Sequence, residues 1–225
     1  MKQIDLRKAF TMIELIFIII IVGILALVAT PRLNDNNLRL AADQLMSHIR
    51  YTQHLAMQAD KFDPNDANWF KKRWQLRFSS RKETEYKEAY TIFEDTVVSV
   101  PGAGPTGSPE KSEIAKNPLN PEKLLTGGTN SIYTTDKIAT SELNIGKKYG
   151  VEKVKFSNSC SIDSSSRIAF DYLGRPLKGN LSTYTSSYQK DRLISAPCEI
   201  TLEHKNGESI IITIEPETGF VDIKN

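Results

Sequence analysis

The feature that most constrains this chain is an apolar run over residues 10–29, FTMIELIFIIIIVGILALVA, which contains a single charged residue, Glu14. Twenty residues in a helix extend about 30 Å, the thickness of the hydrocarbon core of a bilayer. We therefore predict that residues 10–30 form the transmembrane half of an N-terminal helix. A secretory signal peptide is the alternative. Ala26 and Ala29 keep it open, although the apolar region of such a peptide usually has only about 7 to 15 residues.

Positive charges precede this run. Lys2, Arg7 and Lys8 outnumber Asp5 in the first nine residues, and basic flanks stay on the cytoplasmic side of a membrane. Residues 1–9 are therefore predicted to lie in the cytoplasm, with the chain beyond residue 30 on the far side. These nine residues also account for the whole formal charge of +2, so bulk positive charge does not direct the rest of the chain to nucleic acid.

Glu14 is the unusual residue of the run, because an ionised side chain inside a membrane costs about 2.5 to 3.5 kcal/mol on insertion scales. One interpretation places it near the interface, where it reaches water. The other follows from cutting the chain between Ala9 and Phe10, which creates an α-ammonium group at the start of the helix. A neighbouring copy of the helix, shifted along its axis, then pairs this amine with the Glu14 carboxylate.

Lys8 and Ala9, followed by FTMIEL and a long aliphatic run, resemble the class III signal of type IV pilins and of type II secretion pseudopilins. The resemblance implies that residues 1–9 are a cytoplasmic leader peptide, and that a prepilin peptidase cuts between Ala9 and Phe10 and N-methylates Phe10. It also implies that Glu14 directs filament assembly and that Pro31 kinks the helix. The implied partners are other pilin or pseudopilin subunits and an assembly platform in the bacterial inner membrane, with the filament in the periplasm.

Two later segments, FDYLGRP at residues 170–176 and IEPETGFVDI at residues 214–223, resemble H-type minor pseudopilins. Simple tight turns at Gly174 and Gly219 are the alternative interpretation of these segments. The resemblance implies a minor pseudopilin of a type II protein secretion system. Two other functions stay open: a minor pilin of a type IV pilus or DNA-uptake system, and a membrane-anchored periplasmic domain with no filament role.

The remaining sequence predicts an α+β fold. Over residues 31–60, apolar residues recur every three or four positions, which predicts the amphipathic half of the same helix. Residues 61–225 are predicted to be a β-rich globular domain packed on that helix as an antiparallel sheet. Half of the ten prolines fall at about 101–150, which predicts a long exposed loop. The segments with a strand pattern are WQLRFS, YTIFED, VEKVKFS, RIAFDYLG, CEITLEH, SIIITIEP and FVDI. The sequence Lys-Asn-Gly-Glu between residues 199–204 and 209–215 predicts a hairpin turn.

Cys160 and Cys198 are the only cysteines in the chain. On the topology above both lie outside the cytoplasm, in a compartment that permits disulfides, so we predict that they pair. The alternative is two buried free thiols. Because neither cysteine belongs to a Cys-x-x-Cys motif, the bridge is expected to be structural.

No segment predicts enzymatic chemistry. Gly102, Gly104 and Gly107 match the spacing of a dinucleotide-binding loop, but Pro105 interrupts the pattern and no helix is predicted to follow it. The three histidines are too dispersed in the sequence for a zinc site. The oxygen-rich residues 60–68 lack the spacing of a calcium loop and are expected to form a turn after the helix. We therefore expect a protein with no enzyme activity, cofactor or metal.

One basic stretch keeps a nucleic-acid function open. Lys71, Lys72 and Arg73 lie among aromatic residues at positions 69, 70 and 74, a combination typical of surfaces that bind single-stranded nucleic acid. The alternative, which we prefer, is a strand with its aromatic side chains inward and its charges in solvent.

Overall fold

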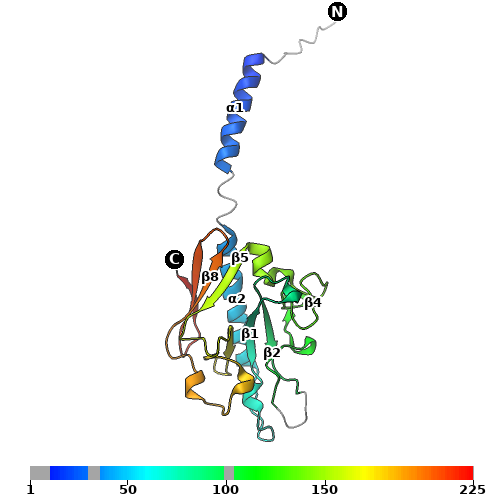
Figure 1. Ribbon diagram of the computed structural model, residues 1–225, viewed down its shortest axis with the longest axis vertical. Helices are drawn as coiled ribbons and strands as arrows, with labels where there is room; N and C mark the ends of the chain where they lie inside the picture. Colours follow the sequence, from blue (N-terminus) through cyan, green and yellow to red (C-terminus); the bar gives the residue numbers. More distant parts are fainter. Residues whose placement is uncertain (1–10, 30–35, 99–103, 225) are drawn as a thin grey trace, which may run out of the picture. The chain divides into compact units, whose positions relative to one another are not determined.

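The computed structural model describes residues 11–29, 36–98 and 104–224, and the chain divides into two units, Met1–Asn37 and Leu38–Asn225. The first unit contains helix α1 (Met12–Ala29). Nearly all of helix α2 (Asn36–Gln58) and the β-strands belong to the second, which we call the globular unit (Figure 1).

The prediction of one long helix with a transmembrane half is wrong. Helix α1 ends at Ala29 and α2 begins at Asn36. Within the part of the chain that the structure describes, no helix is both long and apolar enough to cross a membrane. Pro31, the predicted kink, lies outside the described residues.

The globular unit contains two four-stranded sheets and a small hairpin, all antiparallel, so the α+β class with antiparallel sheets is confirmed. The first sheet has the order β2–β1–β6–β7, the second has the order β10–β9–β8–β5, and β3 pairs with β4. The strands are β1 (Trp74–Ser79), β2 (Ala89–Glu94), β3 (Lys116–Asn117), β4 (Asn120–Leu124), β5 (Val151–Phe156), β6 (Arg167–Phe170), β7 (Pro176–Lys178), β8 (Cys198–His204), β9 (Ser209–Ile214) and β10 (Val221–Lys224).

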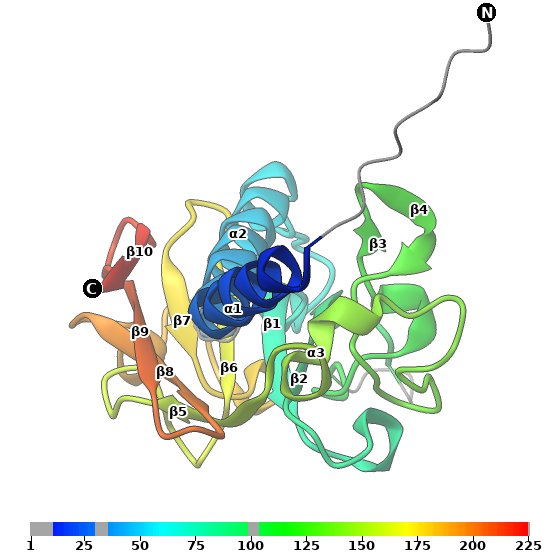
Figure 2. The ribbon, with the colours of Figure 1, turned by 90° about the horizontal axis from the view of Figure 1, so that it is seen from above.

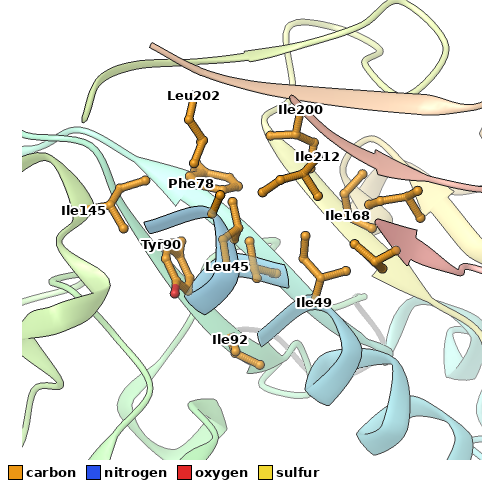
Figure 3. Packing of buried hydrophobic residues seen from close by; sticks show 14 of the residues in the cluster. Leu45, Ile49, Phe78, Tyr90, Ile92, Ile145, Ile168, Ile200, Leu202 and Ile212 are labelled. Atoms are coloured by element: carbon orange, nitrogen blue, oxygen red, sulfur yellow. The ribbon is translucent and has the colours of Figure 1, made fainter. Parts of the chain in front are cut away.

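Helix α2 packs against both large sheets and forms one core with them (Figure 2). Its amphipathic pattern has the expected effect, because the apolar stripe of the helix is buried while its other faces stay exposed. Leu45 and Ile49 belong to the same buried cluster as Ile168 of the first sheet and Ile200 and Ile212 of the second (Figure 3).

All seven segments with a strand pattern form strands, namely β1, β2, β5, β6, β8, β9 and β10. The hairpin between β8 and β9 also agrees with its turn sequence. Gly207 has a φ of +89°, and the His204 amide donates a hydrogen bond to the Glu208 carbonyl across the turn (2.8 Å).

The segment predicted as a long exposed loop at about 101–150 differs from that expectation. Between residues 104 and 150 it contains β3, β4 and the short helix α3 (Ile145–Tyr149). Strand β2 explains the difference, because it is buried on both faces: Ile92 points into the main core, and Phe93 packs against Ile114, Ile132 and Ala139 of this segment. Pro118 lies in the turn between β3 and β4, and Pro121 lies within β4 itself, whereas the apolar residues of the segment cover the sheet.

Candidate functional site

The surface of α1 is the first candidate, because its side chains are apolar on every face. From Met12 to Leu25 each described side chain is exposed, from 44% for Ile18 to 85% for Met12. Single exposed apolar residues are ordinary, but a helix that is apolar all round is normally covered by a membrane or by other helices. We therefore expect the apolar surface of α1 to be covered by a membrane or by other helices.

Glu14 is the only charged residue of α1 and lies in its first turn. The Glu14 and Leu15 amides both donate to the Thr11 carbonyl (3.1 and 3.3 Å), which orders the start of the helix. A carboxylate in this position is favoured by the helix dipole. Among the described residues Glu14 has no ion-pair partner, and Ala9 and Phe10, the predicted cleavage and methylation site, lie outside them. Its role in assembly stays a prediction.

A polar cluster connects α2 to the rest of the globular unit. Gln44 donates to the Tyr90 hydroxyl (2.9 Å) and to the Glu142 carbonyl (3.1 Å), and it accepts a hydrogen bond from the Tyr149 hydroxyl (2.8 Å). His48 Nδ1 lies 2.7 Å from the same Tyr90 oxygen, and burial lowers the pKa of His48 to about 4. The imidazole is therefore neutral near pH 7, and its contact with the Tyr90 hydroxyl helps to position α2 against β2.

A second set of hydrogen bonds connects α2 to residues 170–176 and 214–223, the two segments compared with H-type pseudopilins in the sequence analysis. Gln53 Nε2 donates to the Gly174 carbonyl and to the Thr218 carbonyl, both at 2.8 Å. Gly174 and Gly219 have φ values of +80° and +62°, and a Cβ on Gly219 would lie 2.5 Å from Gln53 Nε2. These glycines are needed both for the turns and for their close approach to α2. The sequence indicated the turns but not the contact with the helix.

The predicted disulfide is confirmed. Cys160 and Cys198 are bonded and completely buried, with a Cα–Cα distance of 5.1 Å. The bond ties the turn after β5 to the first residue of β8.

Lys71, Lys72 and Arg73 do not form one exposed basic surface. Lys72 forms an ion pair with Asp66 (2.7 Å), and Lys71 lies 5.9 Å from the centre of the Phe70 ring. Arg73 is buried, with an Nη2 donating to the Ser187 carbonyl (3.3 Å). Burial lowers the pKa of Arg73. The geometry does not favour a nucleic-acid interface here.

Sequence reasoning missed a buried charged cluster around Gly107. Asp95 Oδ2 accepts from the Gly107 amide (2.8 Å), while Arg77 and Arg167 both donate to the Gly107 carbonyl (3.3 and 3.1 Å). Burial, followed by the nearby Glu113 carboxylate, raises the pKa of Asp95 to about 7. The cluster holds the end of a proline-rich loop on the first sheet. No pattern in the sequence connects these residues, because they come from distant segments.

The oxygen-rich residues 60–68, which were considered as a calcium site, stabilise turns of the backbone. Asp60, Asp63 and Asp66 each accept a hydrogen bond from the backbone amide two residues later, at 3.0, 2.9 and 2.8 Å, as in turns. In the described part of the chain, no group of three or more His, Cys, Asp or Glu residues could hold a metal ion.

Comparison with known proteins adds no family to this picture: no family model, curated protein or solved structure matches the chain.

Proposed function

We propose that this chain is a pseudopilin-like structural subunit of a helical filament, most similar to a minor pseudopilin of a type II protein secretion system. The observation that carries the proposal is the segment from Lys8 to Leu15, with its single glutamate at the start of an apolar run. A helix that is apolar on every face and carries one carboxylate is suited to packing among copies of itself. The protein is proposed to be structural, not catalytic.

Two further observations support a role as an assembled subunit. The apolar stripe of α2 is already buried against the sheets of its own globular unit, and Gln44 and Gln53 add hydrogen bonds to the same unit. By contrast, the described apolar side chains of α1, from Met12 to Leu25, are all exposed and available to neighbours. In the filament we expect the Glu14 carboxylate to pair with the Phe10 ammonium of an adjacent copy and to fix their axial register.

The proposed location of the globular unit is the periplasm. The Cys160–Cys198 disulfide supports this, since such bonds persist in oxidising compartments and are rare in the cytosol. The location of the precursor at the bacterial inner membrane, with its leader in the cytoplasm, depends on the resemblance alone. The DNA-uptake alternative is not taken further, because Arg73 is buried and Lys72 is paired.

The first test is the mature N-terminus. The full chain, expressed with a prepilin peptidase, is expected to lose residues 1–9 and to gain a methyl group on Phe10, as measured by intact mass and N-terminal sequencing. An Ala9→Arg variant is the control and should stay uncut. A wild-type chain that still begins at Met1 would refute the proposal and leave the anchored domain as the better description.

The second test concerns Glu14. The variant Glu14→Ala should leave thermal unfolding of the globular unit unchanged while lowering cross-linking into filaments at least about tenfold, since it leaves the neighbouring amine unpaired. Glu14→Asp retains the charge and serves as the matched control. Equal incorporation of Glu14→Ala and wild type would contradict the pairing.

A further inference from the structure

A pocket with excess positive charge lies on one side of the globular unit. It has a volume of about 510 Å³ and is lined by β4, the segment that follows it, and α3. The lining includes four lysines and one carboxylate, Asp136. A pocket of this size accommodates several side chains of another molecule. The lysines are Lys123, Lys137, Lys147 and Lys148.

The charges of this lysine pocket are only partly neutralised. Lys147 is paired with Glu85, and Asp136 accepts a hydrogen bond from the Tyr133 amide (2.8 Å). In residues 36–98 and 104–224, no carboxylate forms an ion pair with the other three lysines of the pocket. Because the hydroxyl of Thr135 adds a hydrogen-bond donor to the lining, while that of Ser141 donates to Glu142 (3.4 Å), the pocket is suited to an anionic group through its lysines above all.

The turn between β9 and β10 has the complementary chemistry. Glu215 and Glu217 are exposed there, and the described residues provide neither with an ion-pair partner. The backbone of this acidic turn is held in place: the Glu215 amide donates to the Phe220 carbonyl (2.8 Å), and Gln53 donates to the Thr218 carbonyl (2.8 Å). Ordering the turn on binding therefore loses little entropy.

The lysine pocket and the acidic turn lie on opposite sides of the globular unit. Strands β9 and β10 are on one side of α2, and β4 and α3 are on the other (Figure 2). The two surfaces of one copy are thus directed away from each other. Each is available to a different neighbour.

We propose that the lysine pocket of one copy binds the acidic turn of a second copy of this chain. The inference deepens the proposed function and depends on it in one respect, namely that a filament brings copies side by side. A contact between two different surfaces repeats head to tail, and where the rotation does not close it generates a helix. Two adjacent copies are enough to form it.

The contact can be tested by direct coupling of amines to carboxylates. Full chain labelled with ¹⁵N is mixed with unlabelled chain and treated with a carbodiimide, which joins a lysine to a carboxylate only where they touch. Mass spectrometry should find mixed-label peptides that link Lys137 or Lys148 to Glu215 or Glu217, in lower yield at high salt. If links of this kind are absent, or occur only within one label, the contact does not exist.

Charge reversal gives the matched control. Lys137→Glu with Lys148→Glu, and Glu215→Lys with Glu217→Lys, should each lower the yield of these links at least about tenfold. A mixture of the two variants should form the links again. The basic pocket of the variant with reversed glutamates then binds the acidic turn of the variant with reversed lysines. The same reversal at the exposed Lys190 and Lys205, outside the lysine pocket, should have no effect. If the mixture does not recover, an acidic molecule other than this chain is the better occupant.

This result is separable from the proposed function. Coupling does not need cleavage after Ala9, so an uncut chain that forms the links would refute the filament family but not the contact. A chain that is cut and methylated without forming the links would refute the contact alone. Thermal unfolding of each variant excludes misfolding as the cause of a lost link.

Discussion

Helices α1 and α2 are of similar length, with 18 and 23 residues, but differ in what surrounds their side chains. Along α1 every described side chain from Met12 to Leu25 is exposed, and nearly all of them are apolar. Along α2 the residues that face the sheets are buried, from Leu38 to Ala56, and Gln44 and Gln53 hydrogen-bond to β2 and to the turn at Gly174. The amphipathic pattern of α2 thus indicates which face packs against the sheets of the same chain. The apolar pattern of α1 indicates only that its surface needs a partner, not which partner.

The largest effect is expected from removing α1 altogether. A chain that begins at Asn36 should stay folded, since the core belongs to the globular unit, and it should self-associate much less than the full chain, because only the contact between globular units is then left. Size-exclusion chromatography with light scattering measures the second effect and thermal unfolding the first. A truncated chain that unfolds would show that α1 stabilises the globular unit.

The disulfide lies in the globular unit, together with nearly all of α2. Replacing both Cys160 and Cys198 with Ser should lower the free energy of unfolding by up to about 4 kcal/mol, because the bond closes a loop of 38 residues in the unfolded chain. Urea unfolding of the variant and of wild type measures the loss. Reductant should have no effect on the stability of the variant, and a loss that appears only in wild type after reduction identifies the bond as the cause.

The same substitution in each helix gives the most direct comparison. Leu45→Ala, at a completely buried position, should cost about 3 kcal/mol through lost apolar contact and a cavity. Leu15→Ala, at a position 54% exposed, should change the unfolding of the globular unit by less than about 0.5 kcal/mol. Denaturant titration measures both values. Similar losses would mean that α1 packs on the globular unit.

The smallest effect concerns acid. Burial lowers the pKa of His48 to about 4 from the ordinary value near 6.5, so the stability that the neutral ring contributes is complete above pH 6.5 and is lost as the pH falls toward 4. Between pH 7 and pH 5 the contribution of His48 to the free energy of unfolding should fall by about 2 kcal/mol.

The matched variant for this prediction is His48→Gln, which should remove most of the loss, as measured by urea unfolding at the two pH values. Asp95 acts in the opposite direction, because its raised pKa makes the fold less stable as the pH rises toward 7. The difference between variant and wild type isolates His48. An unchanged pH dependence in the variant would contradict its assignment.

Local patterns were sufficient for much of the fold. Strand alternation placed β1, β8 and β9, and the sequence Lys-Asn-Gly-Glu placed the turn between the last two. The stripe on α2 was readable for the same reason, since three- and four-residue spacing puts side chains on one face. The pairing of Cys160 with Cys198 followed from compartment and number.

What could not be predicted depends on contacts between distant segments. Strands β3 and β7 have only two and three residues, too few for a pattern. The proline-rich segment was mistaken for a loop because Ile114, Ile132 and Ala139 are widely spaced and meet only when they cover β2. The lysine pocket likewise gathers residues from β4, the segment after it, and α3, which no local spacing indicates.

The burial of the Cys160–Cys198 bond also dictates an order of events. Both sulfur-bearing side chains have no exposed surface in the folded unit, so an oxidoreductase cannot reach them once the core has closed. The bond must therefore form while the chain is still open, before β8 settles against α2. Afterwards a reductant gains access only as fast as the unit unfolds, so the lifetime of the bond becomes a measure of the lifetime of the fold.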